Sequence, residues 1–262
     1  VGNINYNYPK LSIDSVNKAK KSSSRILCDA FWNSIDYANL KSQLKNQLNF
    51  FDIGCGSGNY GKLYENLSGP FFGSYTGIDI YKHKNFPEKF KFIESSAENI
   101  SQYINDRVNF ITSQSALEHI EKDFYVLEQT TKKLSELNKL FIQVHMLPAS
   151  KSLWLYLWHG YRQYSKKNLM NIINKLKEKY EINISVVPLG GNYSFWTHLK
   201  NITLPIIFHS LKNKKNFKWH NQLNIEKKIL NSVKKDLNYK GESPIFWALI
   251  ISSKNIVLKY KY

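Results

Sequence analysis

An acid and three alternating glycines follow an apolar run near residue 50, in the order FFDIGCGSGNYG over residues 50–61. Glycine adopts positive φ values and lets the backbone approach a ligand without a Cβ in the way, and the first turn of a following helix leaves N–H groups without partners. A strand that ends in such a turn and then enters a helix is therefore suited to bind a nucleotide-like ligand.

Two ligand classes use this kind of turn, and the spacing favours one of them. From Gly56 the residues match G-x-G-x-x-G, and Asp79 follows roughly 20 residues later, as a nicotinamide dinucleotide site requires. From Asp52 they match D-x-G-x-G-x-G, a pattern that also uses Gly54 and Gly58. Because the apolar run ends directly before Gly54, the turn starts there, which favours the second pattern.

With this pattern the chain resembles the class I S-adenosylmethionine-dependent methyltransferases, over roughly residues 45–187 and 243–253. The resemblance implies an α/β fold with a Rossmann-like, seven-stranded mixed sheet flanked by helices, and S-adenosylmethionine as the cofactor. It further implies that Asp52 helps to hold the methionine ammonium. The backbone from Gly54 through Cys55 and Gly56 to Gly58 would seat the amino-acid and ribose side of the cofactor.

Two later segments extend the resemblance to the nucleoside half of the cofactor. Residues 75–80, YTGIDI, form a short predicted strand that ends in an acid. The resemblance implies that Asp79 accepts hydrogen bonds from both ribose hydroxyls and that Ile80 packs on adenine; capping of the next helix is the alternative role for Asp79. Ser96 and Ala97 stand in the junction that contacts adenine in this family, which often has an acid at Ser96, and Glu98 is the nearest carboxylate that could replace it.

A fourth segment, residues 108–120, passes from an extended stretch into a helix and ends in Leu-Glu-His-Ile. This ending is similar to that of many small-molecule methyltransferases and implies that Ser113 and Gln114 lie beside the cofactor. Some metal-dependent relatives bind a divalent cation here through a Glu and a Glu-His pair. In this chain Ser115 replaces the first Glu, and the remaining donors suit a hard cation poorly, so we expect no metal.

Histidines are the candidate general bases. A fifth predicted strand over residues 140–144 delivers His145 to its carboxyl end, where open α/β sheets place their ligands. A neutral imidazole there could take the proton of the methyl acceptor as the methyl group is transferred. Orientation of the substrate is the alternative role for His145, and His119, His159 or a reaction without a base also remain open.

Outside this core the sequence predicts two caps. Residues 1–45 form an N-terminal cap with a helix over about 26–48, broken near Asn39, whose aromatic residues Tyr6, Tyr8 and Trp32 are lid candidates. Residues 46–187 and 243–262 form the cofactor-binding core. Residues 188–242, between strands predicted at 181–187 and 243–251, are too many for a plain loop and should fold as a helical insertion.

Charge and aromatic content bear on the acceptor. The chain of 262 residues carries a net charge of +17, and residues 200–240 hold ten lysines against Glu226 and Asp236. A basic insertion suits an anionic partner. The aromatic stretch at 153–164 follows the fifth strand, where it would serve as an acceptor lid or as an ordinary buried helix face, and Arg162 and His159 could meet a phosphate.

The sequence therefore predicts a cytoplasmic enzyme that methylates a small polar acceptor, with O-methylation of a phosphorylated sugar or glycan precursor as the first choice. An RNA methyltransferase, supported by Phe217 and Trp219 in the lysine-rich insertion, and a non-catalytic binding module are the alternatives; a dehydrogenase is disfavoured. No apolar run reaches the length of a membrane span, no signal-peptide pattern stands at the start, and two cysteines allow neither a disulfide framework nor a zinc cluster.

Overall fold

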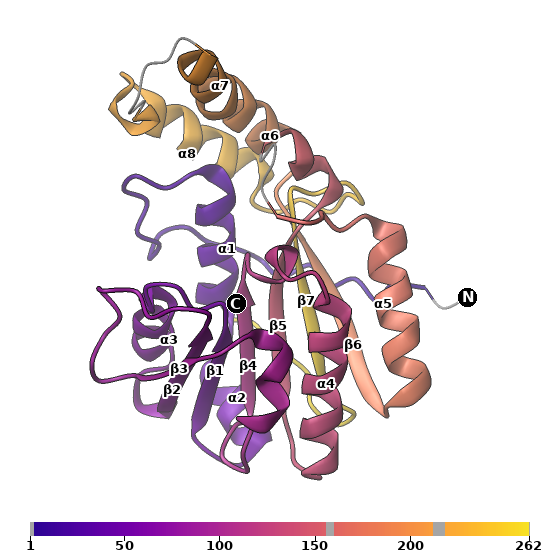
Figure 1. The fold of residues 1–262 in the computed structure, drawn as a ribbon. Coiled ribbons are helices and arrows are strands. Elements are labelled where there is room, and N and C mark those ends of the chain that lie inside the picture. Colours follow the sequence, from indigo (N-terminus) through magenta and orange to yellow (C-terminus); the bar gives the residue numbers. More distant parts are fainter. Residues whose placement is uncertain (1–2, 156–159, 212–217, 262) are drawn as a thin grey trace.

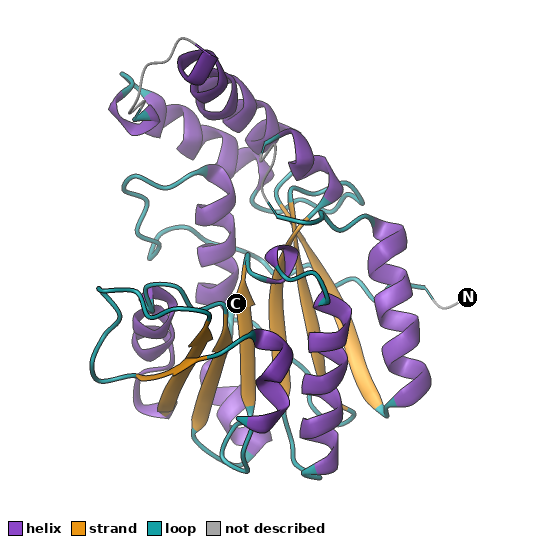
Figure 2. Cartoon of the chain, in the orientation of Figure 1, coloured by secondary structure: helices purple, strands orange, loops and turns teal. Residues whose placement is uncertain are grey.

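The computed structural model describes residues 3–155, 160–211 and 218–261, and within them the chain forms a seven-stranded sheet with helices on both faces (Figures 1 and 2). The strands are β1 (Leu48–Ile53), β2 (Phe72–Asp79), β3 (Lys91–Glu94), β4 (Phe110–Gln114), β5 (Ile142–Pro148), β6 (Ile182–Leu189) and β7 (Phe246–Ser253). Their order is β3-β2-β1-β4-β5-β7-β6, and β7 runs antiparallel to both of its neighbours while the other pairs are parallel. This confirms the predicted Rossmann-like mixed sheet.

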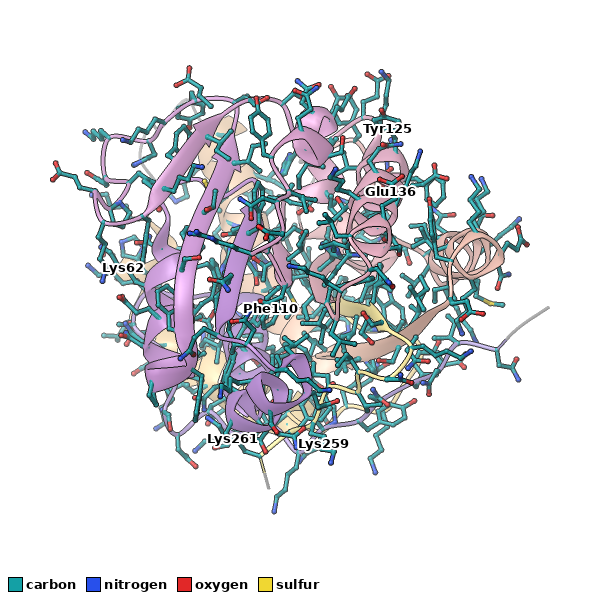
Figure 3. The ribbon with its side chains drawn as sticks, turned by 90° about the horizontal axis from the view of Figure 1, so that it is seen from below. Lys62, Phe110, Tyr125, Glu136, Lys259 and Lys261 are labelled. Atoms are coloured by element: carbon teal, nitrogen blue, oxygen red, sulfur yellow. The ribbon has the colours of Figure 1, made fainter. Side chains whose placement is uncertain are left out.

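Alternation along the strands builds a core on each face of the sheet. Successive side chains of a strand point to opposite faces, so Phe50 packs in one hydrophobic cluster and Phe51 in the other. The first cluster includes α1 (Ser23–Ser34), α2 (Tyr37–Leu44) and α3 (Asn59–Ser68), and the second includes α4 (Asp123–Glu136) and α5 (Lys166–Lys179). Figure 3 shows Phe110 of β4 amid these side chains, with Lys259 and Lys261 at the outer edge.

The N-terminal segment differs from the prediction. The single helix expected over about 26–48 is two helices, because Ile35 is extended and Asp36 caps α2 by accepting a hydrogen bond from the backbone N–H of Asn39. The break thus lies at residues 35–36 and not near Asn39. Tyr6 pairs with Val186 of the edge strand β6 and stacks on Tyr8, so neither tyrosine lies over the glycine turn.

The insertion between β6 and β7 is helical, as predicted. It contains α6 (Asn192–His198), a π-helical turn (Leu199–Thr203), α7 (Leu204–Leu211), a 3-10 turn (Trp219–Asn221) and α8 (Ile225–Asp236). The apolar face of α8 is buried through Ile225, Ile229 and Val233, and its lysines face solvent. Because α8 packs on α1 and α6, the insertion stands above the carboxyl ends of the parallel strands (Figure 1).

The aromatic segment after β5 is described only in part. Residues Ser150–Trp154 form a 3-10 turn, Leu155 is buried, and Leu153 and Trp154 are exposed, so this part does not form the buried helix face. Further along, Ser165 is the N-cap of α5, since its hydroxyl accepts from the N–H of Asn168. Among the described residues, every helix is too short or too polar to cross a membrane.

Candidate functional site

The glycine turn after β1 has the backbone geometry that its sequence predicts. Gly54, Gly56 and Gly58 have φ values of 67°, 50° and 69°, a region that residues with a Cβ rarely adopt. The N–H of Gly54 donates to the carbonyl of Ile78 at 2.9 Å, and the N–H of Gly58, the N-cap of α3, donates to the carbonyl of Cys55 at 2.9 Å. A Cβ added at Gly54 would lie 2.5 Å from the Cβ of Ala116. The turn is therefore bound to β2 on one side and packed against the loop after β4 on the other.

This turn opens into the larger of two cavities above the sheet, with a volume of about 940 Å³. Most of the residues that line it come from four elements: the turn itself, the N-terminal part of α1, α3 and the helical insertion. The turn contributes Asp52, Gly54, Cys55, Gly56 and Ser57, and the insertion contributes His198, Ile202, Thr203, Ile206 and Trp219. The size and the backbone cradle fit a nucleoside-containing cofactor.

Asp52 lies at the floor of this cavity and is 2 % exposed. Its carboxylate accepts hydrogen bonds from the hydroxyls of Tyr75 at 2.6 Å and Thr112 at 2.9 Å. Burial raises the pKa of Asp52 to about 7, against the opposing effect of these two hydrogen bonds. An ammonium group from a ligand would favour the ionised carboxylate, so the residue suits the predicted role.

The raised pKa of Asp52 makes stability depend on pH. Because the folded protein binds this proton more tightly than the unfolded chain, its contribution to stability is fully present below about pH 4. About 4 kcal/mol is lost as the pH rises through about 7. Asparagine does not titrate, so the free energy of unfolding of Asp52→Asn should increase relative to that of the wild type as the pH is raised from about 4 to 7. Urea unfolding at several pH values measures this difference. Parallel stability profiles for the two proteins would contradict this assignment.

Asp79, at the end of β2, stabilises the glycine turn through hydrogen bonds to the backbone. One carboxylate oxygen accepts from the N–H of Gly56 at 2.8 Å and the other from the N–H of Ile80 at 2.8 Å. Asp79 does not line either cavity, although each carboxylate oxygen can accept more than one donor. The side chain of Ile80 is 71 % exposed, as a platform for a ligand ring would be.

The predicted adenine junction lies at the end of β3, away from both cavities. Ser96 caps the 3-10 helix Ala97–Gln102 by accepting from the N–H of Glu98. Glu98 forms an ion pair with Lys122 at 3.2 Å. These residues thus have structural partners in the protein, and their contact with adenine stays a prediction.

The position predicted for His145 is wrong. The apolar run continues through Met146 and Leu147, so β5 ends at Pro148 and His145 lies inside the strand. It is fully buried, its Nδ1 lies 2.9 Å from the Oγ of Ser113 on β4, and burial lowers its pKa to about 3. Neither His145 nor Ser113 lines a cavity.

Of the other two candidate histidines, the structure describes His119. It lies in the 3-10 turn Leu117–His119, is exposed and lines neither cavity. His159 lies outside the described residues. Within the part of the chain that the structure describes, no group of His, Cys, Asp and Glu side chains could hold a metal ion.

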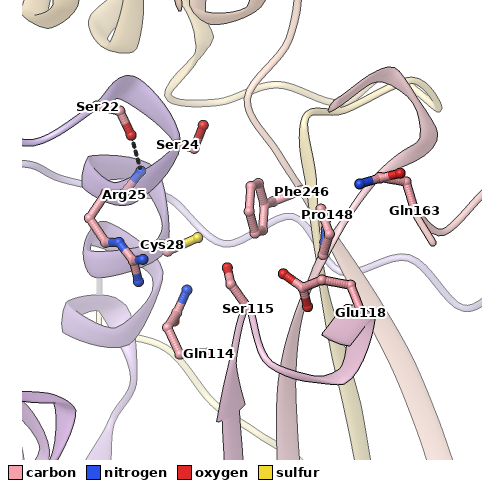
Figure 4. Close-up of a pocket in the computed structure, with 10 residues that line it drawn as sticks. All are labelled: Ser22, Ser24, Arg25, Cys28, Gln114, Ser115, Glu118, Pro148, Gln163 and Phe246. Atoms are coloured by element: carbon pink, nitrogen blue, oxygen red, sulfur yellow. Dashed lines mark hydrogen bonds between the residues drawn. The ribbon is translucent and has the colours of Figure 1, made fainter. Parts of the chain in front are cut away.

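A smaller cavity of about 170 Å³ lies between α1, the carboxyl ends of β4 and β5, and the amino end of the antiparallel strand β7 (Figure 4). Ser22, Arg25 and Gln114 line both cavities, so the two adjoin there. The Oε1 of Gln114 accepts from the Nε1 of Trp32 at 2.9 Å, which makes Trp32 a support for Gln114 and not a lid. Other residues that line the small cavity are Ser24, Cys28, Ser115, Glu118, Pro148, Gln163 and Phe246.

Sequence reasoning missed Arg25 and considered Glu118 only as a metal ligand. Arg25 lies in no recognisable motif. The only sequence signal for it was a positive charge near the start of a helix that precedes the first strand. Glu118 stands between Leu117 and the exposed His119, and an acid in an apolar stretch after a strand end is the pattern that could have identified it.

Comparison with known proteins gives the fold. No protein-family model and no curated protein matches the chain. The solved structure of the plantazolicin methyltransferase BamL, in complex with a triazolic desmethylPZN analog and SAH, is similar with a TM-score of 0.57 and 18% identity over 88% of this chain and 86% of that one. The plantazolicin methyltransferase BpumL in complex with SAH is similar with a TM-score of 0.53 and 15% identity, over 88% and 84% of the two chains. The chain therefore has the fold of these class I methyltransferases.

Proposed function

We propose that this chain is an S-adenosylmethionine-dependent methyltransferase that acts on a small polar acceptor. The observation that carries the proposal is the glycine turn at the end of β1, whose positive-φ backbone opens into a cavity of about 940 Å³. The likeness to two methyltransferases solved with SAH, the product form of the cofactor, supports the same ligand here.

The chain's own residues provide binding and orientation. When bound, the cofactor supplies a methyl group that a positively charged sulfonium activates. Asp52 provides a carboxylate for the ammonium group, and the backbone of Gly54 and Gly56 makes the close approach that a side chain would prevent. Holding acceptor and methyl carbon in contact accounts for most of the acceleration expected of such an enzyme.

A sugar or glycan precursor that carries phosphate is the acceptor that we favour, with methylation on oxygen. The larger cavity has Lys20, Lys21 and Lys62 in its walls together with Arg25, and such cations suit a phosphate. Lys21 is already paired with Asp29 at 2.6 Å, which leaves Lys20 and Lys62 as the better candidates.

RNA is the second candidate acceptor because α8 presents Lys227, Lys228, Lys234 and Lys235 to solvent. Phosphate contacts would make RNA affinity fall steeply with salt, so RNA binding that is absent or insensitive to salt would remove this candidate. A non-catalytic module would bind SAH and transfer no methyl group to any acceptor.

Thermal denaturation tests the proposal directly. A ligand that binds only the folded state raises the melting temperature, so we expect saturating SAH to raise it by several degrees and NAD to leave it unchanged. Stabilisation by NAD alone would identify a dinucleotide-binding protein instead. A screen with labelled S-adenosylmethionine over phosphorylated sugars, lipid-linked sugars and RNA then identifies the acceptor class.

A further inference from the structure

Glu118 is a buried carboxylate in the smaller cavity. The residue is 3 % exposed, and its Oε2 has no hydrogen-bond partner among the described residues. Its backbone carbonyl accepts from the N–H of Tyr161 at 2.6 Å, and Gly160 is packed so closely that an added Cβ would lie 2.7 Å from that carbonyl oxygen. The loop at residues 160–161 therefore fixes the backbone that carries this carboxylate. Figure 4 shows the carboxylate turned toward Ser115, on the side facing Phe246 and Pro148.

An unpartnered carboxylate oxygen in such a place costs stability. A buried acceptor without a donor has lost its hydrogen bonds to water and has no protein hydrogen bond in their place. This destabilises the folded state by about 1–3 kcal/mol, and by more for a charged group. Burial also raises the pKa of Glu118 to about 7, against the opposing effect of a backbone hydrogen bond and of Arg25. A ligand that donates a hydrogen bond to Oε2 would remove this cost.

The site connects directly to the cavity that we assign to the cofactor. Arg25 and Gln114 stand in the walls of both cavities, and Gln114 is the last residue of β4, three positions before the turn that holds Glu118. A cofactor seated on the glycine turn and reaching Gln114 has the small cavity directly beyond it. Glu118 thus faces the place where an acceptor would meet the methyl group.

We infer that Glu118 accepts first the hydrogen bond and then the proton of the methyl acceptor, and that the acceptor atom is a neutral hydroxyl oxygen bound in the smaller cavity. This inference rests on the proposed function. In the step, a lone pair of the hydroxyl oxygen forms a bond to the methyl carbon, the bond from that carbon to sulfur breaks, and its electron pair stays on sulfur. The hydroxyl proton moves to the Glu118 carboxylate, which releases it to solvent when the product leaves.

The charges around Glu118 favour a hydroxyl over other nucleophiles. An ionised carboxylate as acceptor would be repelled by Glu118. A protonated amine would be repelled by Arg25 and attracted by Glu118, but it has no lone pair with which to attack the methyl carbon. The thiol of Cys28, whose pKa burial raises to about 12, stays neutral. Tyr164, which interacts electrostatically with Glu118, also has a raised pKa and stays neutral. A neutral hydroxyl fits between Arg25 and Glu118 without an added charge.

The test compares the affinities of S-adenosylmethionine and SAH, because only the first carries the sulfonium charge. Once ionised, a carboxylate that faces the methyl group favours the sulfonium form. The quantity to compare is the ratio of the dissociation constant of SAH to that of S-adenosylmethionine. Between about pH 6 and pH 8 we expect this ratio to rise about tenfold more in the wild type than in Glu118→Gln. Calorimetry gives both dissociation constants at each pH. Asp52 titrates in the same range but is present in both proteins, so the difference between them isolates Glu118.

The control is Glu121→Gln, which alters an exposed carboxylate three residues further along the same loop and should follow the wild type. Identical pH profiles for the wild type and Glu118→Gln, with normal SAH binding by both, would overturn the role of Glu118 and leave the proposed function standing. Absence of SAH binding by the wild type would instead overturn the proposed function and this inference with it. SAH binding by Glu118→Gln also shows that the variant is folded.

Discussion

Replacing Gly54 by alanine is expected to weaken SAH binding by more than about 100-fold, since two separate costs of about 1–3 kcal/mol each fall on the same position. The first is the φ of 67°, which alanine rarely adopts. The second is the clash of the new Cβ with that of Ala116, 2.5 Å away, in the loop between β4 and the Glu118 turn. Relief of this clash moves the turn, which borders the larger cavity, or the loop, which borders the smaller one. Calorimetry with SAH and a melting curve measure the two effects.

Two further variants separate these costs. Gly69 has a similar φ of 52°, has no atom within 4 Å of an added Cβ and lies outside both cavities, so Gly69→Ala should lose stability and keep its SAH affinity. In the double variant Gly54→Ala with Ala116→Gly, the clash is removed and only the backbone strain remains. We expect this pair to recover at least tenfold of the lost affinity, which corresponds to about 1.4 kcal/mol. Equal SAH affinity of Gly54→Ala and the wild type would show that the ligand does not lie on the turn.

Replacing Asp79 by alanine is expected to weaken SAH binding by about 10- to 100-fold. The carboxylate holds the N–H of Gly56 at 2.8 Å, and a hydrogen bond to a charged group contributes about 1.5–3 kcal/mol. Without it, the middle of the turn loses its attachment to β2. The ribose contact that the resemblance implies would add to the loss. Calorimetry with SAH measures the change.

The contribution of a ribose contact can be measured separately. We expect the wild type to prefer adenosine over 2′,3′-dideoxyadenosine in competition with SAH, and Asp79→Ala to lose most of this preference. A preference that is unchanged in the variant would leave Asp79 only its role in holding the turn. Glu94→Gln is the matched control, because Glu94 is the register partner of Asp79 on β3, is exposed and lines neither cavity.

The parts of the site that could be predicted are those governed by local backbone chemistry. The run from Leu48 to Ile53 followed by glycine predicts a strand and a turn without any tertiary information, and both are present. The helical insertion was expected from its length, since a plain loop of that size is uncommon in a compact domain, and from the helical spacing of apolar residues over 225–237. In each case the local sequence determines the local structure, whatever the rest of the fold.

The position of His145 could not be predicted in this way. The strand was expected to end at Val144, but β5 continues to Pro148, because a buried strand accepts a polar residue when a neighbouring strand supplies a partner. Ser113 lies opposite His145 in the register of β4 with β5 and provides that partner at 2.9 Å. Pairing between residues 32 positions apart is invisible to a pattern that runs along the chain.

The smaller cavity was missed for a similar reason. Its walls combine Arg25 and Cys28 from α1, Glu118 from the loop after β4, and Phe246 from the first position of β7. These residues share no spacing in the sequence, and each alone has an ordinary structural explanation. Only the packing of α1 over this end of the sheet places them together.

The shape of the turn after β1 depends mainly on backbone conformation and on backbone N–H groups. The turn is held by N–H groups that donate to the Ile78 carbonyl and to Asp79, and its shape depends on three glycines. A ligand that lies on this turn would therefore constrain few side chains, because most of its contacts there would be made by the backbone. An identity of only 18% with BamL, at a TM-score of 0.57, fits this conclusion, because two chains can share this fold and differ in most of their side chains.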